Sequence, residues 1–371
     1  MVALVDEAID EAGFRRGRAQ RPEDLAGATF VFGFDQAAVE QLHQGIVVAR
    51  LMEGVSYPLY RVAWWLAASW IGFAFILFFC MLGGHLVEAI VKRAGEWPGD
   101  GAKLYSVGIP VVLGMLLGIV GLVQGLSEPT LARIDVAVEG LPEAADGLTI
   151  VQISDTHIGA IRGVGWTRAL VDRVNALEPD IVAVTGDLVD ENAGSLMRFE
   201  ETLSLLKAKR GVYAVTGNHE YIHGAQQAIE LMKRARMRVL GNEVVEPVPG
   251  LRVVGLHDQV GGAFRVEGHG IGDDDLAQLV RSDAATILLY HQPVRVERFA
   301  ELGVDLMLCG HTHEGQIWPF GLIQKIIYPR NVGRYEVNGM TLYVSSGTGT
   351  WGSPMRLGTR SEFVLVTLRR R

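Results

Sequence analysis

The chain has 371 residues, of which 49% are hydrophobic and 20% are charged, and its formal net charge is −8. This length suits one large domain or two of ordinary size. The negative charge argues against a nucleic-acid-binding protein, which normally presents a basic surface. The two cysteines provide no disulfide framework and leave the redox compartment open.

Residues 1–58 form the first section of the chain and mix charged residues with short apolar patches. They predict a poorly specified cytosolic or interfacial extension. Residues 1–10 are acidic and lack the apolar core of a secretory signal, so no cleaved leader is expected there.

Two long apolar runs without formal charge follow, Val62–Leu82 and Leu104–Leu126. Each reaches the ~20 residues that a helix needs to cross a bilayer. A pair of buried core helices is the alternative, but such helices are rarely apolar on every side. We therefore expect a two-helix transmembrane hairpin within residues 59–126 and a multi-pass protein of the inner or plasma membrane. A polar loop at residues 83–103 joins the two runs. It holds three basic residues, and three others flank the pair, so the orientation of the hairpin stays open.

Glycines recur at four-residue spacing in the second run, at Gly114 and Gly118 and again at Gly121 and Gly125. This spacing suits close packing of helices, and it is equally typical of ordinary membrane glycines. Residues 127–147 then predict a linker to a soluble domain that occupies residues 148–371.

Short runs rich in β-branched residues alternate with helical patterns in the soluble domain. Such alternation indicates a layered α/β core. The expected strands are Leu148–Ser154, Ile181–Thr185, Val212–Thr216, Leu251–Leu256, Thr286–Tyr290, Val304–Cys309, Leu342–Ser345 and Phe363–Leu368. The expected helices include Trp166–Leu177, Leu196–Lys209, Ala225–Ala235 and Val294–Leu302.

Five of the expected strands end in residue types that bind metals. Ligands of α/β proteins lie outside the carboxyl ends of strands, so these residues would converge on one edge. Each motif alone is typical of an ordinary turn or a buried histidine, but five in order on five strands argue for a site. Glycine precedes several of them, which suits backbone that turns sharply beside a bound group. The motifs are Asp155-Thr156-His157, Gly186-Asp187, Gly217-Asn218-His219-Glu220, His291 and Gly310-His311-Thr312-His313. The remaining histidines keep the ordinary interpretation of structural residues: His43, His85, His223, His257 and His269.

This set of motifs, with Gly186–Asp190 as Gly-Asp-x-x-Asp, resembles the calcineurin-like metallophosphoesterase family over about residues 148–368. The resemblance implies an α/β fold, a layered β-sandwich core flanked by helices. The segments Gly315–Gly321 and Gly347–Gly352 are similar to the membrane-associated bacterial branch of the family. Two departures are Glu314, where that branch usually has glycine, and the hairpin, because the branch often has four membrane helices. A carboxylate at Glu314 would tune the surroundings of the metals or face solvent, and we favour solvent.

The resemblance also implies which residues hold metals. Two divalent ions, Mn²⁺, Fe²⁺ or Zn²⁺, are expected, because oxygen and imidazole donors suit these ions and argue against Ca²⁺. Asp187 would bridge both ions, and His219 would stabilise the transition state or protonate the leaving group. Supporting contacts to the ligands or the substrate are expected from Asp190, Glu220 and Arg356. One ion would be held by Asp155, His157 and His313, and the other by Asn218, His291 and His311.

Two such metals polarise a phosphate and activate water, so the expected reaction is hydrolysis of a phosphodiester or pyrophosphate bond. The hairpin favours the lipid bilayer as a partner and a lipid-linked substrate. A UDP-2,3-diacylglucosamine-type pyrophosphate of lipid A synthesis is the specific substrate that the resemblance suggests. A general phosphodiesterase or phosphatase tethered to the membrane stays open. A non-catalytic metal-binding sensor also stays open, although the intact His219 argues against it. A transporter is disfavoured because two uncharged helices offer no polar pathway.

The segment Ile317–Arg330 directly follows the last histidine pair and combines apolar bulk, aromatic rings and two basic residues, Lys325 and Arg330. Such a composition is typical of a surface that meets lipid. It is equally typical of a loop folded into the domain core.

Overall fold

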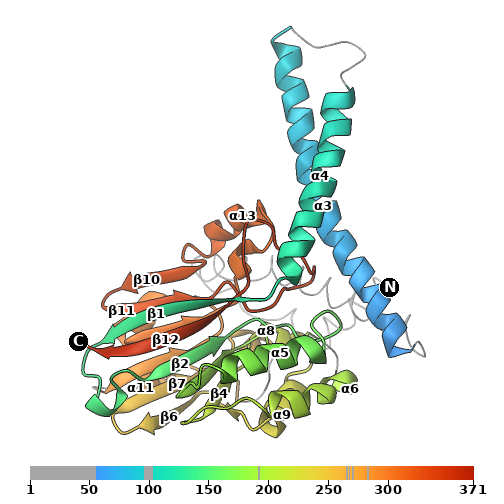
Figure 1. Ribbon diagram of the computed structural model, residues 1–371. Helices are drawn as coiled ribbons and strands as arrows, with labels where there is room; N and C mark the ends of the chain where they lie inside the picture. The colour runs from blue at the N-terminus through green and yellow to red at the C-terminus, as the bar shows by residue number, and fades with distance from the viewer. Residues whose placement is uncertain are drawn as a thin grey trace, which may run out of the picture. The chain divides into compact units, whose positions relative to one another are not determined.

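A computed structural model describes residues 56–371, except residues 96–102, 191–192, 265, 267, 270 and 282–283 (Figure 1). The predicted extension at residues 1–58 therefore lies almost wholly outside the described residues.

The two apolar runs are helical. Helix α3 covers Tyr57–Arg93, and a short π-helix at Leu104–Gly108 continues into α4 at Ile109–Leu126. Both helices are long and apolar enough to cross a membrane. The loop expected at residues 83–103 begins later than predicted, because residues 85–93 contain no glycine or proline and α3 continues through them.

Two six-stranded sheets form the soluble domain and confirm the predicted layered sandwich (Figure 1). Strands β2, β3 and β4 are parallel, as are β7, β8 and β9, and both sets are rich in buried β-branched residues. In spatial order the first sheet contains β1 (Thr130–Val138), β12 (Glu362–Arg370), β2 (Thr149–Ile153), β3 (Ile181–Thr185), β4 (Val212–Val215) and β5 (Arg238–Val239). The second contains β10 (Gly333–Val337), β11 (Met340–Val344), β9 (Leu306–Cys309), β8 (Ala285–Leu289), β7 (Leu251–Gly255) and β6 (Glu243–Val248).

Three apolar layers hold the domain together. The central layer lies between the sheets and includes Val215, Ile287 and Leu306. One outer layer packs α5 (Val164–Asn175), α7 (Glu200–Leu203) and α9 (Ala225–Arg234) on the first sheet. The other packs α11 (Asp273–Val280) and α12 (Val296–Glu301) on the second sheet. The other helices among the described residues are short: α6 (Ala193–Leu196), α8 (Asn218–His223), α10 (Val260–Ala263), α13 (Phe320–Ile327) and 3₁₀ turns at Glu143–Ala145, Met197–Phe199 and His313–Gly315.

The predicted linker at residues 127–147 is wrong, because Thr130–Val138 forms strand β1 and pairs in parallel with β12. Polar and apolar residues alternate along β1, and most of its side chains are exposed or half-buried. An edge strand of this kind lacks the continuous apolar run that marks a buried strand. The short or partly polar strands β5, β6 and β10 were missed for the same reason.

The α4 glycines lie at two different contacts. A Cβ on Gly118 would fall 2.2 Å from the ring of Phe73, so α4 packs closely on α3 there. A Cβ on Gly125 would fall 2.3 Å from the carbonyl oxygen of Pro354, which belongs to the soluble domain. The glycine spacing therefore serves both helix packing and docking of the soluble domain.

Candidate metal centre

The metal-binding residue types all follow strands whose carboxyl ends lie at the same edge of their sheet. The first sheet supplies residues after β2, β3 and β4, and the second sheet supplies residues after β8 and β9. Parallel strands bring these positions together, as expected for a site in an α/β protein. The residues are Asp155, His157, Asp187, Asn218, His219, His291, His311 and His313.

One donor group contains Asp155, His157 and His313, all of them buried. The Nε2 atoms of His157 and His313 lie 3.0 Å apart. His313 Nε2 is 3.4 Å from Asp155 Oδ1. Three donor atoms from two sheets thus face one another, as the ligands of a metal ion do.

The second donor group contains Asn218, His291 and His311. Asn218 Oδ1 lies 3.1 Å from His291 Nε2 and 2.9 Å from His311 Nδ1, and the two nitrogens are 3.2 Å apart. Tetrahedral ligands at zinc-like bond lengths are about 3.3 Å apart. The donors therefore fit a small divalent ion.

Asp187 lies between the two groups. Its Oδ2 is 3.2 Å from His291 Nε2 and 3.8 Å from His157 Nε2. Its Oδ1 accepts a hydrogen bond from the backbone N–H of His219 at 2.8 Å. This position fits the predicted bridging role.

Charge and burial set the pKa values of the centre. Burial acts to raise the pKa of Asp187, but the positive charge of His291 outweighs it and holds the pKa well below its usual range. Burial lowers the pKa of His311 to about 3, so its imidazole is neutral. Burial also acts to lower the pKa of His157, but the charge of Asp190 is the main cause of its rise to about 9. Metal binding must release this proton, because only a neutral imidazole is a ligand.

The backbone at the centre is unusual. Positive φ angles occur at Asp155, His157, Asp187, His311 and His313, which are five of the seven predicted ligands. Such angles are costly for residues with a side chain and concentrate at functional sites.

Two glycines permit the close approach of the loops. A Cβ on Gly217 would lie 2.2 Å from Asp187 Oδ1, and one on Gly310 would lie 2.0 Å from Asp155 Oδ2. These distances are impossible for a real side chain, so the structure supports the predicted need for glycine beside the ligands.

Two carboxylates, the buried Glu220 and the half-buried Asp190, hold the centre in place. Glu220 accepts hydrogen bonds from the backbone N–H groups of Asp187, Leu188 and Gly217 at 3.0, 2.8 and 2.6 Å, which ties two strand-end loops together. Asp190 Oδ1 lies 3.5 Å from His157 Nδ1. A carboxylate at this position fixes the ring orientation of a ligand histidine.

Asp190 also orients His219. His219 Nδ1 is 2.7 Å from Asp190 Oδ1, and the His219 ring lies edge-on to the ring of His157 at 4.6 Å. His223 Nε2 is 3.1 Å from the same oxygen. The ordinary interpretation of His223 is therefore incomplete, because this side chain shares the carboxylate that positions His219. No spacing motif marked His223.

Of the other four histidines, the three that the structure describes lie apart from this set. His257 and His269 stack at 3.7 Å, and burial lowers the pKa of His257 to about 4. His85 contacts Glu88 on α3. His43 lies outside the described residues.

Arg356 is completely buried beside His313, a candidate ligand. Its guanidinium donates to the carbonyl oxygens of His313, Ser346 and Gly349 at 3.3, 2.7 and 2.9 Å. The side chain therefore supports the loop of His313. Because the guanidinium is fully buried and donates to backbone carbonyl oxygens, the structure favours the supporting role.

Tyr328 borders the centre, although no motif marked it. Its hydroxyl is 2.9 Å from His311 Nε2 and donates to Gln292 Oε1 at 3.3 Å. Because His311 Nδ1 faces the donor group, Nε2 is the nitrogen that donates to Tyr328. The contact depends on the path of the whole segment between His313 and Tyr328, which sequence patterns do not specify.

Glu314 is half-buried, so the expectation of a solvent-facing carboxylate holds only in part. Its backbone has a φ of 55°, the left-handed conformation that favours glycine. This conformation explains why glycine suits the position.

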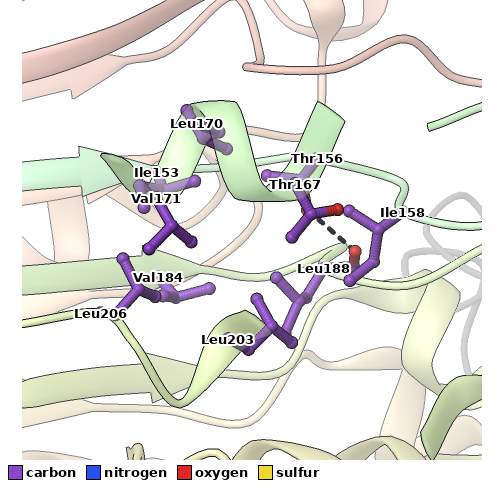
Figure 2. A pocket seen from close by; sticks show the side chains of 10 residues that line it. All are labelled: Ile153, Thr156, Ile158, Thr167, Leu170, Val171, Val184, Leu188, Leu203 and Leu206. Atoms are coloured by element: carbon purple, nitrogen blue, oxygen red, sulfur yellow. Dashed lines mark hydrogen bonds between the residues drawn. The ribbon is translucent and has the colours of Figure 1, made fainter. Parts of the chain in front are cut away.

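A separate apolar cavity of about 10 Å³ lies between α5 and the first sheet (Figure 2). Thr156 points into it and donates to the carbonyl oxygen of Leu188 at 2.8 Å, while its neighbours Asp155 and His157 belong to the metal-binding group. The cavity has room for about one water molecule. It is a packing defect and not a substrate site.

A two-sheet sandwich with histidines and aspartates at the strand ends defines the metallophosphoesterase class of proteins. The model of the calcineurin-like phosphoesterase family matches residues 148–315. A transmembrane protein with metallophosphoesterase domain from Bos taurus is 32% identical over 312 residues, which cover 79% of this chain and 70% of the relative. An uncharacterized metallophosphoesterase from Aquifex aeolicus is 36% identical over 242 residues, 64% of this chain and 90% of the relative.

Among solved structures, a dimetal phosphatase from Danio rerio matches with a TM-score of 0.37 and 15% identity, covering 56% of this chain and 90% of that one. The chain belongs to the calcineurin-like phosphoesterase family and is a metal-dependent phosphoesterase. Its two apolar helices and its transmembrane relatives indicate membrane association.

Proposed function

We propose that the chain hydrolyses a phosphodiester or pyrophosphate bond of a lipid-linked substrate at the membrane surface. Two divalent ions, with Mn²⁺ as the first to test, would be held by the two donor groups and by Asp187 between them. Bound there, the ions would polarise the phosphate and activate water.

The chain's own residues would position the reaction. Asp187 and Asp155 are ionised, so their charges favour cations at this edge. Asp190 binds Nδ1 of His219, which leaves Nε2 as the nitrogen that would donate a proton to the leaving oxygen.

The observation that carries the lipid assignment is the placement of α13. Its residues are all exposed or half-buried, and Leu322, Ile323 and Ile326 present large apolar side chains to the surroundings. The alternative of a loop folded into the core therefore does not describe α13. Exposed apolar surface of this kind marks an interaction site.

Helix α13 connects the membrane hairpin to the metal centre. At its start, the ring of Phe320 lies 6.4 Å from the ring of Phe75 on α3. Just after its end, Tyr328 contacts His311. A lipid that lies along α13 would therefore bring its phosphate groups toward the metals. Arg330, one of the two basic residues of this segment, pairs with Glu297 at 2.7 Å.

UDP-2,3-diacylglucosamine in vesicles is the substrate to test first, against a small soluble phosphodiester. The double change Leu322→Ser with Ile326→Ser removes two exposed apolar side chains. We expect activity on the vesicle substrate to fall at least about tenfold, because burying each such side chain is worth about 1.5–3 kcal/mol. Activity on the soluble phosphodiester should stay close to that of the unmodified chain.

Val244→Ser is the matched control, since Val244 is an exposed apolar residue on β6. An equal loss of both activities in the α13 variant would show that α13 supports the fold. Unchanged vesicle activity would refute the lipid assignment and favour a general phosphodiesterase tethered to the membrane.

A further inference from the structure

A second candidate binding site lies where α3 meets α5, outside the metal centre. It is an open pocket of about 460 Å³, lined by Tyr57, Arg61, Arg198, Trp166, Ile161 and residues 163–165. Among the lining residues that the structure describes, two carry guanidinium groups and none is acidic. The pocket is therefore basic.

Arg61 is held at this pocket by a contact with the soluble domain. Its Nε donates to the carbonyl oxygen of Ala160 at 2.9 Å. A Cβ on Gly163 would lie 3.4 Å from Arg61 Nη2, so the guanidinium lies against the start of α5. Arg198 stacks on the ring of Tyr57 at 4.3 Å.

The first turn of α5 adds to the positive potential. Gly163 is its N-cap and provides no capping side chain, and its first turn contains no acidic residue. The N–H groups of a first helical turn lack partners within the helix and carry the positive end of its dipole. Among the described residues, no carboxylate forms an ion pair with Arg61. The positive charge of a guanidinium is repelled by the positive end of a helix dipole unless an anion lies between the two.

The pocket lies at the edge of the predicted membrane span. Arg61 is the last charged residue before the uncharged run Val62–Leu82. Tyr57, Tyr60 and Trp64 surround it along α3 with stacked or tilted rings. Aromatic and basic residues at the end of a span are typical of the headgroup layer.

We propose that this pocket binds the phosphate of an anionic membrane lipid headgroup, with Arg61, Arg198 and the N–H groups of the first turn of α5 as donors. Arginine suits this role because its planar group forms paired hydrogen bonds with phosphate oxygens. The site would hold the soluble domain at the membrane surface, independently of the chemistry at the metal centre.

The test uses the full chain in a neutral detergent, titrated with dihexanoyl-phosphatidylglycerol, dihexanoyl-phosphatidylcholine and inorganic phosphate. We expect phosphatidylglycerol to bind at least about fivefold more tightly than the other two ligands, and Arg61→Gln to weaken it about fivefold. Arg168→Gln is the control, because Arg168 lies on α5 and pairs with Asp172. The difference between these variants shows whether binding depends on Arg61 itself and not on positive charge near α5 in general.

A second variant keeps the test decisive if Arg61→Gln folds poorly. Val164→Asp places a carboxylate in the first turn of α5. Its negative charge stabilises the helix and neutralises the positive potential there. Its thermal stability should be equal or higher, while binding of phosphatidylglycerol is lost. Unchanged binding in Arg61→Gln and Val164→Asp would overturn the proposal. Equal binding of inorganic phosphate and phosphatidylglycerol would overturn the lipid as the source of the phosphate.

Discussion

The strand-end loops and α13 both border the metal centre, but they are built in opposite ways. The loops are buried, and their candidate ligands Asp155, Asp187 and His313 have positive φ angles. Helix α13 has no buried residue and exposes Ile326 at 78% of its surface. One region is fixed by close packing, whereas the other meets the surroundings of the protein.

This difference separates the residues that would carry out the reaction from the residues that would receive the substrate. Donors that must stay within about an ångström of a productive geometry need a rigid frame. A surface that receives a lipid needs exposed apolar side chains and tolerates substitution far better. Changes in the loops should therefore abolish turnover on every substrate, while changes in α13 should discriminate between substrates.

The largest effect is expected from Asp187→Asn. It removes the carboxylate that lies between the two donor groups and leaves an amide that cannot balance the metal charge. We expect less than one equivalent of bound metal, measured by elemental analysis, and turnover near zero. Asp172→Asn, on the exposed surface of α5, should behave like the unmodified chain. Two bound metals and normal turnover in Asp187→Asn would refute the bridging role.

Gly310→Ala tests the rigid frame without changing any donor. The new Cβ would fall 2.0 Å from Asp155 Oδ2 and from Ser154 Oγ, so the first donor group must shift. We expect loss of about one metal equivalent and a fall in activity of at least about 10², since small misplacements of reacting groups cost this much. Gly272→Ala is the control, because the nearest atom to its Cβ would be 3.7 Å away. Full metal content in Gly310→Ala would show that the loops are adaptable.

His219→Ala should separate catalysis from metal binding. The side chain is a predicted proton donor and not a ligand, so both metals should remain bound. Hydrolysis should slow by about 10²–10⁴-fold, as for the loss of a general acid. The loss should be smallest for a nitrophenolate leaving group, which needs no proton. An equal loss on all leaving groups would indicate a purely electrostatic role.

The sheet edge that carries the candidate metal ligands could be predicted from sequence, because each of these residues directly follows a buried strand. Asp155, Asp187 and Asn218 lie within three residues of an apolar run, so local order alone placed them. Strand β1 could not be predicted in this way, because its pairing with β12 joins residues that are far apart in sequence. The contact of Tyr328 with His311 and the place of His223 beside Asp190 likewise depend on tertiary structure.

The hairpin of α3 and α4 also has a tertiary contact that could not be predicted from sequence. Glycine spacing indicated a close contact in α4 but not its partner. In the structure, the backbone N–H of Arg356 donates to the carbonyl oxygen of Gly121 at 2.8 Å. Arg356 in turn supports the loop of His313. The membrane helix is therefore linked to a candidate metal ligand through a single residue.

The smallest effect is expected from Gly125→Ala, which tests this link. Alanine favours a helix over glycine by about 1 kcal/mol, so a free helix would be stabilised. At Gly125, however, the Cβ would fall 2.3 Å from the carbonyl oxygen of Pro354 and 2.6 Å from Met355 Cα, which are backbone atoms. Forcing them apart should cost about 1–3 kcal/mol and lower the unfolding temperature.

Gly83→Ala on α3 provides the comparison, because beyond the neighbouring backbone of its own helix no atom would lie within 4 Å of its Cβ. Gly83→Ala should unfold at the same or a higher temperature, while Gly125→Ala should unfold earlier and bind metal somewhat more weakly through the displaced Arg356. If the hairpin were only a tether, the two variants would behave alike in both measurements. If Gly125→Ala lowered the unfolding temperature but left the metal affinity unchanged, the link between α4 and Arg356 would stabilise only the fold. The displacement of Arg356 would then not reach His313.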